Sequence, residues 1–440
     1  MSKSPAPDFR HLEPDYSWSF AECSAKQTGY ITHCYHRYPA KFIPQVAARL
    51  IREHSEPGDA VLDPFMGSGT TLVEALVAGR RARGVDVNPA AIIASRAKTA
   101  PISPIKLRAA LLDFEDRVSW LKDDDRLGRP LFPLPEPLLP ANQERLDWWF
   151  RPAQQRRLGT ILTIIEAAED PAIRAFLRCA FSHTLKTASY WLMKSSKPTR
   201  DKKKVARGVP NPVPALRRHL AKMQRANQAF WRALPDPYKA ASPRAADIRC
   251  GDARKLPWKA GSIDLVVTSP PYVTSYEYAD LHELTALWLG GLAGVAAAKE
   301  MFIGSAAARG RSRAEASSAL GRAIVAKLRE RSQSKAEEVR QYFLDMEDAF
   351  REMHRVLKPG GRVCNVIGNT SLGGVEVLNA EVHAELMGNV GFERLGVIRR
   401  IIPLKTLPQV RDPKTGKFTS VRANSVEAYP EEFIVIGQKG

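Results

Sequence analysis

A glycine turn in the 440-residue chain carries residue types suited to holding a small ligand. Residues 63–71 read Asp-Pro-Phe-Met-Gly-Ser-Gly-Thr-Thr and follow the apolar run 59–63. Glycines let the backbone approach a ligand closely. The third glycine of a dinucleotide-binding motif and the Gly-Lys-Thr of a P-loop are both missing, so a phosphate is not the expected ligand.

A carboxylate follows at the end of the next apolar run. Gly84-Val85-Asp86 places Asp86 where both hydroxyls of a ribose can donate to it. Alone, such a turn is more often an ordinary tight turn, and such an acid is often merely solvated. Together they predict a pocket for a nucleoside that carries no phosphate.

A second segment, residues 264–272, reads Asp-Leu-Val-Val-Thr-Ser-Pro-Pro-Tyr. The amino group of a nucleobase is a poor nucleophile because its lone pair is delocalised into the ring. Acceptors at the Ser269 side chain and the Pro270 carbonyl would favour a pyramidal nitrogen that can attack in line. Pro270 and Pro271 fix their φ angles and hold these acceptors, and Tyr272 offers a face on which an extruded base can stack. In isolation, Ser-Pro-Pro-Tyr is equally a rigid exit from a strand.

The elements around these segments predict an α/β fold with a doubly wound, mostly parallel sheet. We expect strands at 59–63, 82–87, 248–250, 263–267 and 362–367, helices from Pro44, at 70–78, from Asn88-Pro89 and at 347–357, and a terminal antiparallel hairpin of 395–402 with 432–436. Parallel strands end at one edge of such a sheet. The two segments should therefore meet there.

Three regions are expected along the chain. Residues 1–100 form the cofactor-binding half of a catalytic domain, 101–245 an inserted helical and basic lobe, and 246–440 the other half, with an insertion at about 290–340. The lobe is the candidate target-recognition region, although the insertion at 290–340 is a rival. No internal repeat is found.

The chain is strongly basic, with a formal charge of +19 and a sequence pI of about 9.8. This balance is expected of a protein that binds a polyanion. A basic run within 194–225, broken by Gly208 and several prolines, predicts an extended loop along a phosphate backbone. Its candidate contacts with such a backbone are Lys194, Lys197, Arg200, Lys202, Lys203, Lys204 and Arg207.

The cysteines and the hydropathy pattern exclude several classes. Five scattered cysteines without a Cys-x-x-Cys pair suit a reducing cytoplasm and argue against a structural metal. No run of about 18 apolar residues occurs, so a membrane span is not expected. We expect a soluble, cytoplasmic protein with no metal.

These motifs resemble those of the S-adenosylmethionine-dependent DNA amino-methyltransferases, over roughly 250 residues that leave out both insertions. Residues 38–42, Tyr-Pro-Ala-Lys-Phe, resemble the family's cofactor motif, 63–71 its glycine motif and 268–272 its catalytic tetrapeptide with its flank. The resemblance implies a Rossmann-like, seven-stranded methyltransferase sheet, S-adenosylmethionine as cofactor and double-stranded DNA as partner. A separately encoded restriction endonuclease is a further candidate partner.

The resemblance also implies residue roles. Phe65, Gly67 and Gly69 would line the methionine moiety, Asp86 would hold the ribose, and Asp252 would accept from the adenine amino group. Asp63 would contact the ammonium. The full implied cofactor-binding set is Tyr38, Phe42, Asp63, Phe65, Gly67, Gly69, Thr70, Asp86 and Asp252.

In the family, Ser in the first tetrapeptide position is associated with cytosine N4, and Asp or Asn with adenine N6. Ser269 therefore predicts site-specific transfer to cytosine N4 in DNA, by direct in-line attack on a flipped base. The alternatives are a DNA adenine-N6 enzyme, an RNA methyltransferase similar to the transfer-RNA guanine-N2 enzymes, and a non-catalytic nucleic-acid-binding protein. A cytosine-C5 enzyme is not expected because no Pro-Cys dipeptide occurs.

Overall fold

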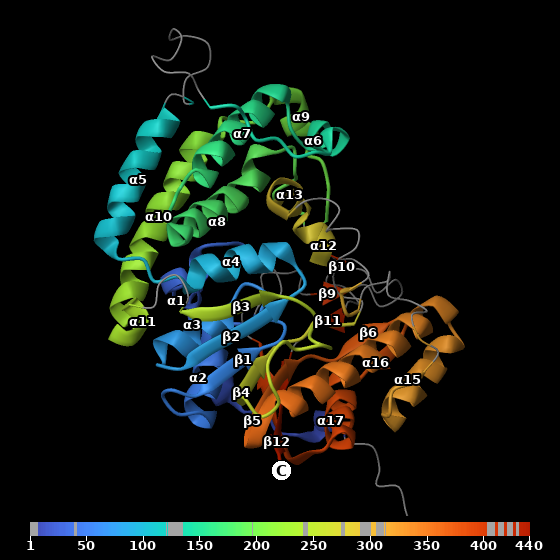
Figure 1. Ribbon diagram of the computed structural model, residues 1–440. Coiled ribbons are helices and arrows are strands. Elements are labelled where there is room, and N and C mark those ends of the chain that lie inside the picture. Colours follow the sequence, from blue (N-terminus) through green and yellow to red (C-terminus); the bar gives the residue numbers. More distant parts are fainter. Residues whose placement is uncertain are drawn as a thin grey trace, which may run out of the picture.

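The computed structural model describes residues 8–38, 42–119, 121, 135–195, 197–240, 245–273, 278–290, 301–304, 312, 314–402, 410–411, 418–419, 426–427 and 431–440. Within these ranges the chain forms a sheet with helices on both faces and a helical lobe above it (Figure 1). No helix in the described ranges combines the length and the apolar character that a membrane crossing needs.

A seven-stranded sheet has the order β3-β2-β1-β4-β5-β12-β8. Its strands are β1 (Ala60–Asp63), β2 (Arg81–Asp86), β3 (Ala246–Cys250), β4 (Ile263–Thr268), β5 (Leu357–Ile367), β8 (Phe392–Ile401) and β12 (Glu431–Lys439). The neighbouring strands β3, β2, β1, β4 and β5 run parallel to one another, while β12 is antiparallel to both β5 and β8. This confirms the expected doubly wound methyltransferase sheet with its terminal antiparallel hairpin.

Side chains of β1 alternate between the two faces of the sheet, as a strand requires. Ala60 and Leu62 pack into the core under α15 (Ala319–Arg329), α16 (Gln333–Val356) and α17 (Asn379–Val390). Val61 packs on the other face with α2 (Pro44–His54) and α3 (Thr70–Val77). The sheet is therefore covered on both faces, which is why its central strands are almost wholly apolar.

Short elements complete this half of the molecule. They are α1 (Ala25–Thr28), β6 (Thr370–Leu372), β7 (Val375–Val377), β9 (Val410–Arg411), β10 (Phe418–Thr419) and β11 (Val426–Glu427). β6 and β7 pair with each other, while β9, β10 and β11 form a separate three-stranded sheet.

The inserted region between β2 and β3 is largely helical. Its helices are α4 (Pro89–Thr99), which flanks the sheet, then α5 (Pro104–Ser119), α6 (Gln143–Trp149), α7 (Pro152–Glu166), α8 (Pro171–Ala188), α9 (Lys202–Arg207), α10 (Pro212–Ala233) and α11 (Asp236–Ala240). α5, α7, α8 and α10 pack around a hydrophobic core of their own. α12 (Tyr278–Leu281) and α13 (Glu283–Thr285), which follow the Ser-Pro-Pro-Tyr tetrapeptide, reach up to this lobe (Figure 1).

The helix at 104–119 was not predicted individually, and two local expectations were wrong. α16 starts well before residue 347. Residues 202–207, expected to be extended, form the short helix α9 because the Asp201 side chain accepts from the backbone N–H of Lys203 at 2.9 Å and caps its first turn.

Candidate functional site

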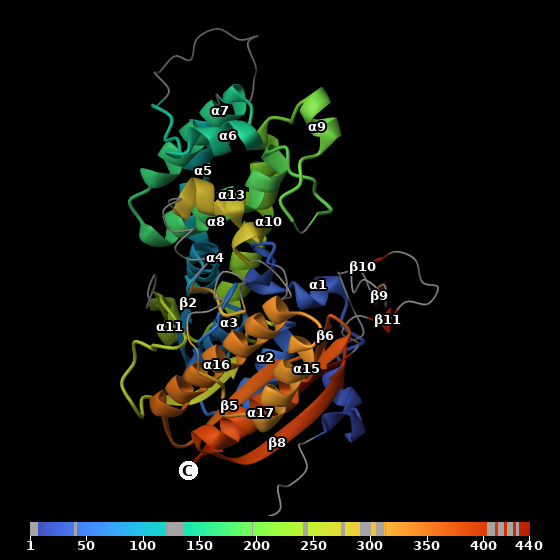
Figure 2. The same cartoon turned by 90° about the vertical axis from the view of Figure 1, so that its right-hand side faces the viewer.

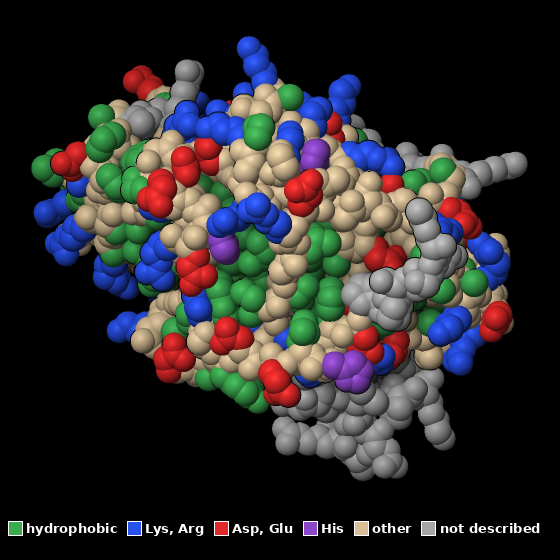
Figure 3. Space-filling view, turned by 90° about the horizontal axis from the view of Figure 1, so that it is seen from below, with side chains coloured by type: hydrophobic (Ala, Val, Ile, Leu, Met, Phe, Trp, Pro, Cys, Tyr) green, Lys and Arg blue, Asp and Glu red, His purple; other side chains and the backbone are tan. Residues whose placement is uncertain are grey.

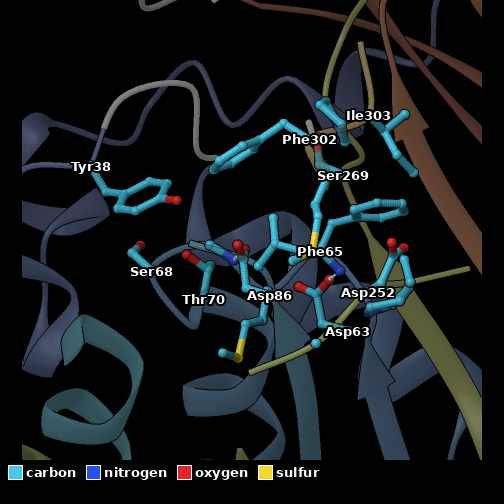
Figure 4. A pocket seen from close by; sticks show the side chains of 18 of the residues that line it. Tyr38, Asp63, Phe65, Ser68, Thr70, Asp86, Asp252, Ser269, Phe302 and Ile303 are labelled. Carbon is cyan, nitrogen blue, oxygen red and sulfur yellow. Dashed lines mark hydrogen bonds between the residues drawn. The ribbon is translucent and has the colours of Figure 1, made fainter. Parts of the chain in front are cut away.

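A pocket of about 780 Å³, counting the part open to solvent, lies at the carboxyl ends of β1, β2, β3 and β4. Ligands bind at this edge in open α/β sheets. As Figure 4 shows, Tyr38 stands on one side and Asp252 on the other, with Asp86 and Asp63 between them. The lining includes Tyr38, Phe42, Asp63, Phe65, Gly67, Thr70, Asp86, Asp252, Ser269 and Pro271.

The glycine turn between β1 and α3 needs its glycines for two reasons. Gly67 and Gly69 have φ angles of 47° and 78°, a region that favours glycine. A Cβ at Gly67 would lie 3.2 Å from Cε1 of Tyr38, and one at Gly69 would lie 2.9 Å from the Ser95 Oγ. Side chains at either position would push against the pocket wall or against α4. Gly69 itself does not line the pocket.

Asp86 ends β2 in the wall of the pocket and stays partly accessible. Its Oδ2 accepts from the backbone N–H of Gly67 at 2.9 Å and its Oδ1 from that of Asn88 at 2.8 Å. Burial raises the pKa of Asp86 to about 6, against the lowering effect of these hydrogen bonds. The carboxylate is thus tied to both the glycine turn and the start of α4.

Asp63 is almost fully buried at the floor of the pocket. Its Oδ1 accepts from the Thr268 hydroxyl at 2.7 Å, and its Oδ2 accepts from the Thr71 hydroxyl at 2.8 Å. Burial raises the pKa of Asp63 to about 6. Neither Asp63 nor Asp86 forms an ion pair with a described residue.

The motif at 38–42 lies next to this turn, although only its two ends are within the described residues. Tyr38 and Phe42 line the pocket. The Tyr38 ring stacks on His282 at 4.5 Å between centroids, and its hydroxyl accepts from the Asn88 side chain at 3.5 Å. Tyr38 therefore contacts the glycine turn, the start of α4 and the segment after the tetrapeptide.

Asp252 follows β3 and lines the opposite side of the pocket, but its carboxylate already has a partner. The Arg254 guanidinium donates to Oδ1 at 3.0 Å and to Oδ2 at 2.6 Å. Arg254 also donates to Asp345 at 2.7 Å. Sequence reasoning did not predict this ion pair, which leaves Asp252 less free to accept from a ligand than Asp86.

The tetrapeptide follows directly after β4. Ser269 and Pro271 line the pocket, whereas Pro270 is buried and Tyr272 is half-buried outside its lining. The Tyr272 hydroxyl donates to Glu432 of β12 at 3.1 Å, and its ring edge lies against Gly368. The Tyr272 side chain is therefore held by Glu432 and Gly368. The sequence predicted a stacking role for its ring but not these contacts.

Residues 301–303 also line the pocket, and sequence reasoning missed them. They belong to the second insertion, where the sequence carries no motif. Arg254 donates to the Met301 carbonyl at 3.3 Å and so links this segment to Asp252. Among the described residues, no group of His, Cys, Asp and Glu side chains is arranged to hold a metal ion.

The basic run lies on the lobe, away from the pocket. Lys194, Lys197, Lys202, Lys203 and Arg207 are exposed. Arg200 stacks over the Trp148 ring at 4.6 Å. Lys204 differs, because its Nζ donates to the carbonyls of Lys186, Ser189 and Trp191 at 3.2, 3.0 and 2.8 Å. The Lys204 ammonium therefore binds carbonyls at the C-terminal end of α8 and is not directed to DNA.

Fold and pocket together define a methyltransferase of the class that uses a nucleoside cofactor. Residues 6–96 match a family model described as DNA methylase. The type II methyltransferase M.MvaI of Kocuria varians is 28% identical over 407 residues, which cover 87% of each chain. The type II methyltransferase M.MjaII of Methanocaldococcus jannaschii is 24% identical over 344 residues, or 61% of this chain and 64% of that protein.

A third relative is the DNA adenine methyltransferase YhdJ of Escherichia coli, 33% identical over 87 residues that cover 20% of this chain and 28% of that protein. The family model and these relatives support an S-adenosylmethionine-dependent DNA amino-methyltransferase of the family that modifies cytosine N4 or adenine N6.

Proposed function

We propose that this protein transfers a methyl group from S-adenosylmethionine to the N4 amino group of cytosine in double-stranded DNA. The observation that carries the proposal is that Ser269 lines the same pocket as Asp86 and the glycine turn. A hydroxyl oxygen at this position suits the two hydrogens of an amino group. We further propose that the target base is flipped, because an amino group inside a duplex is out of reach of this pocket.

The pocket residues fit the cofactor. Asp86 would accept from the ribose hydroxyls, and Asp63 would face the ammonium group of the methionine moiety. Two carboxylates held in one pocket with raised pKa values and without a described cationic partner suit a ligand that carries positive charge and hydroxyl donors. When bound, S-adenosylmethionine supplies an electrophilic methyl group. Phe65 and Gly67 would line its methionine moiety.

The tetrapeptide would act on the acceptor amino group. The Ser269 side chain and the Pro270 carbonyl would accept from the two amino hydrogens and localise the nitrogen lone pair. The nitrogen would then attack the methyl carbon in line, so that the N–C bond forms as the C–S bond breaks. S-adenosylhomocysteine would leave, and one amino proton would pass to solvent. Such acceptors matter most in the transition state, so they raise the rate more than they tighten binding.

Adenine N6 is the second candidate. A specific observation favours it, since one relative that covers a fifth of this chain carries the name of an adenine methyltransferase. The Ser at position 269 favours cytosine, because the family resemblance associates Asp or Asn at that position with adenine.

We propose the lobe at 101–245 as the DNA-contacting, target-recognition part. Figure 2 shows α9 and the small sheet of β9, β10 and β11 projecting from the same side of the molecule. The end of the molecule away from the lobe, seen in Figure 3, mixes Lys and Arg with Asp and Glu around a hydrophobic area. A polyanion favours a surface of one sign, which the exposed side chains of Lys194, Lys197, Lys202, Lys203 and Arg207 offer.

A separately encoded restriction endonuclease is a proposed partner, suggested by the type II names of two relatives. We propose that the reaction takes place in the cytoplasm. The five cysteines are all free thiols, which suits that compartment.

The test is transfer of labelled methyl from S-adenosylmethionine to duplex DNA and to RNA, followed by digestion to nucleosides. We expect label in DNA alone, in N4-methyldeoxycytidine. Label in N6-methyldeoxyadenosine would replace cytosine by the second candidate, and label in RNA alone would overturn the proposal.

A further inference from the structure

A chain of buried hydrogen bonds leads from β5 to the catalytic tetrapeptide. The Tyr342 hydroxyl of α16 lies 3.0 Å from the Pro271 carbonyl oxygen and 3.2 Å from Nε2 of His383 in α17. Nδ1 of His383 lies 3.1 Å from the side-chain nitrogen of Asn365 in β5. Tyr342, His383 and Asn365 are each 0% exposed, so water does not compete with the bonds that join these three side chains.

The chemistry of the groups decides which atom donates in each of these hydrogen bonds. A carbonyl oxygen only accepts, so the Tyr342 hydroxyl donates its single proton to the Pro271 carbonyl. His383 Nε2 must then donate to the Tyr342 oxygen, and His383 Nδ1 must accept from the Asn365 amide. This assignment follows from the network and requires a neutral imidazole. Burial lowers the pKa of His383 to about 3, which agrees with it.

Packing leaves these side chains little freedom. The rings of Tyr342 and His383 stack at 5.9 Å, and Phe350 meets His383 edge-on at 5.3 Å. Buried polar side chains cost folding free energy unless they are hydrogen-bonded, and apolar residues of similar shape would serve stability equally well. Stability alone therefore does not explain why these hydrogen-bonded side chains end at the Ser-Pro-Pro-Tyr segment.

That role is visible in the backbone of the tetrapeptide. Pro270 and Pro271 have fixed φ angles, so their soft torsions are the two ψ angles, and ψ of Pro271 is the last one before Tyr272. The Tyr342 hydroxyl fixes the direction of the Pro271 carbonyl and with it that torsion. The Tyr272 hydroxyl, bound to Glu432, fixes the next residue. The segment that carries Ser269 is thus held by α16 on one side and by β12 on the other.

We propose that Tyr342, oriented by His383 and Asn365, is a positioning residue for methyl transfer that holds the Ser-Pro-Pro-Tyr segment in its reactive geometry. This inference rests on the proposed methyltransferase function but not on the choice of base. Small misplacements of reacting groups lower rates by up to about 100-fold without a matching loss of binding. The proposed signature is therefore a fall in kcat at constant affinity.

The first test is Tyr342→Phe, with Tyr35→Phe as the matched control. Tyr35 is also 0% exposed, but its hydroxyl has no hydrogen-bond partner among the described residues. Single-turnover methyl transfer should fall about 10- to 100-fold in Tyr342→Phe and stay near the parent rate in Tyr35→Phe. Dissociation constants for S-adenosylmethionine and DNA should stay within twofold of the parent.

A second pair of variants separates positioning from packing. His383→Gln keeps a donor for Tyr342 and an acceptor for Asn365, so it should retain most of the rate, whereas His383→Leu should lose it as Tyr342→Phe does. A parent-like rate in Tyr342→Phe would overturn the inference. So would equal losses in both His383 variants, or a loss that simply follows weakened cofactor binding and a lowered Tm.

The readout is labelled methyl in total DNA, so it is independent of the base modified. If the product is methyladenine, the cytosine proposal fails while the rate comparison stands. If the parent transfers no methyl group to any nucleic acid, the proposed function and this inference both fail.

Discussion

The Thr268 hydroxyl donates to Asp63 Oδ1 at 2.7 Å, and this hydrogen bond joins the residue before Ser269 to the last residue of β1. Asp63 lies at the pocket floor and also accepts from the backbone N–H of Phe65 at 3.0 Å. The Ser-Pro-Pro-Tyr segment and the glycine turn are therefore held to one carboxylate. The proposed cofactor side and the proposed acceptor side of the pocket are joined through Asp63.

Thr268→Val tests this link, because it keeps the side-chain shape and removes the hydroxyl. Losing a hydrogen bond to a charged acceptor costs about 1.5–3 kcal/mol. We expect weaker S-adenosylmethionine binding in calorimetry together with a lower kcat. Thr184→Val is the matched control, since Thr184 is buried in the lobe and donates to the Ala180 carbonyl. Equal binding by parent and Thr268→Val would separate the two halves.

Asp86→Ala should weaken S-adenosylmethionine binding by about 1.5–3 kcal/mol, or roughly 10- to 150-fold in Kd, because the ribose acceptor is lost. DNA affinity, measured by anisotropy of a labelled duplex, should change little. Asp59→Ala is a suitable control, since Asp59 stands at the opposite end of β1. An unchanged cofactor Kd in Asp86→Ala would mean that this acid does not hold the ribose.

Cofactor affinity should depend on pH near 6. Burial raises the pKa values of Asp63 and Asp86 to about 6, and both are expected to bind the cofactor as carboxylates. Affinity should therefore weaken as the pH falls through 6, with proton release on binding near that pH. Calorimetry in two buffers of different ionisation enthalpy measures this release, and a pH-independent Kd from pH 5 to pH 7 would contradict it.

For the protein without cofactor, the same raised pKa values give the free energy of unfolding the opposite dependence on pH. Between pH 3.8 and about 6 the unfolded chain loses these two protons while the folded protein keeps them. The free energy of unfolding should therefore fall as the pH rises through that window, as far as these two groups are concerned. Asp63→Asn and Asp86→Asn should each flatten the dependence in urea unfolding.

The exposed part of the basic run should contact DNA phosphates. Replacing Lys202, Lys203 and Arg207 by Gln should weaken binding to all sequences and flatten the salt dependence by up to about three units of slope. Lys204→Gln is the contrasting variant, because its ammonium closes the end of α8. It should lower Tm and leave the salt slope unchanged. An unchanged slope of the salt dependence in the triple variant would mean that DNA binds to another part of the surface.

Sequence alone was enough for the sheet, because strands such as β1 and β4 are short apolar runs that end in polar residues. It also placed Ser269, Asp86 and the glycine turn at one edge, since parallel strands share that edge. The contacts of Lys204 and Asp252 were not predictable. Lys204 reaches carbonyls 13 to 18 residues away, and a charge pattern does not show which lysine folds back onto a helix end. Arg254 is only two residues from Asp252, but a charge pattern does not show that its side chain turns back to this acid.

The residues that hold the tetrapeptide by hydrogen bonds could not be predicted from the sequence either. Tyr342, His383 and Glu432 lie 41 to 160 residues from the residues they hold, and none belongs to a local motif. The 301–303 segment lines the pocket only because the chain returns there after a long insertion. Long-range pairings of this kind depend on the complete topology.

The most direct test of the central claim is the nucleoside composition of DNA from a host that expresses the protein, compared with a host that expresses Ser269→Ala. Mass spectrometry of the digested DNA should find N4-methyldeoxycytidine with the parent and little or none with Ser269→Ala, although purified Ser269→Ala should still bind S-adenosylmethionine. N6-methyldeoxyadenosine in its place, or equal N4-methyldeoxycytidine from parent and variant, would contradict the account.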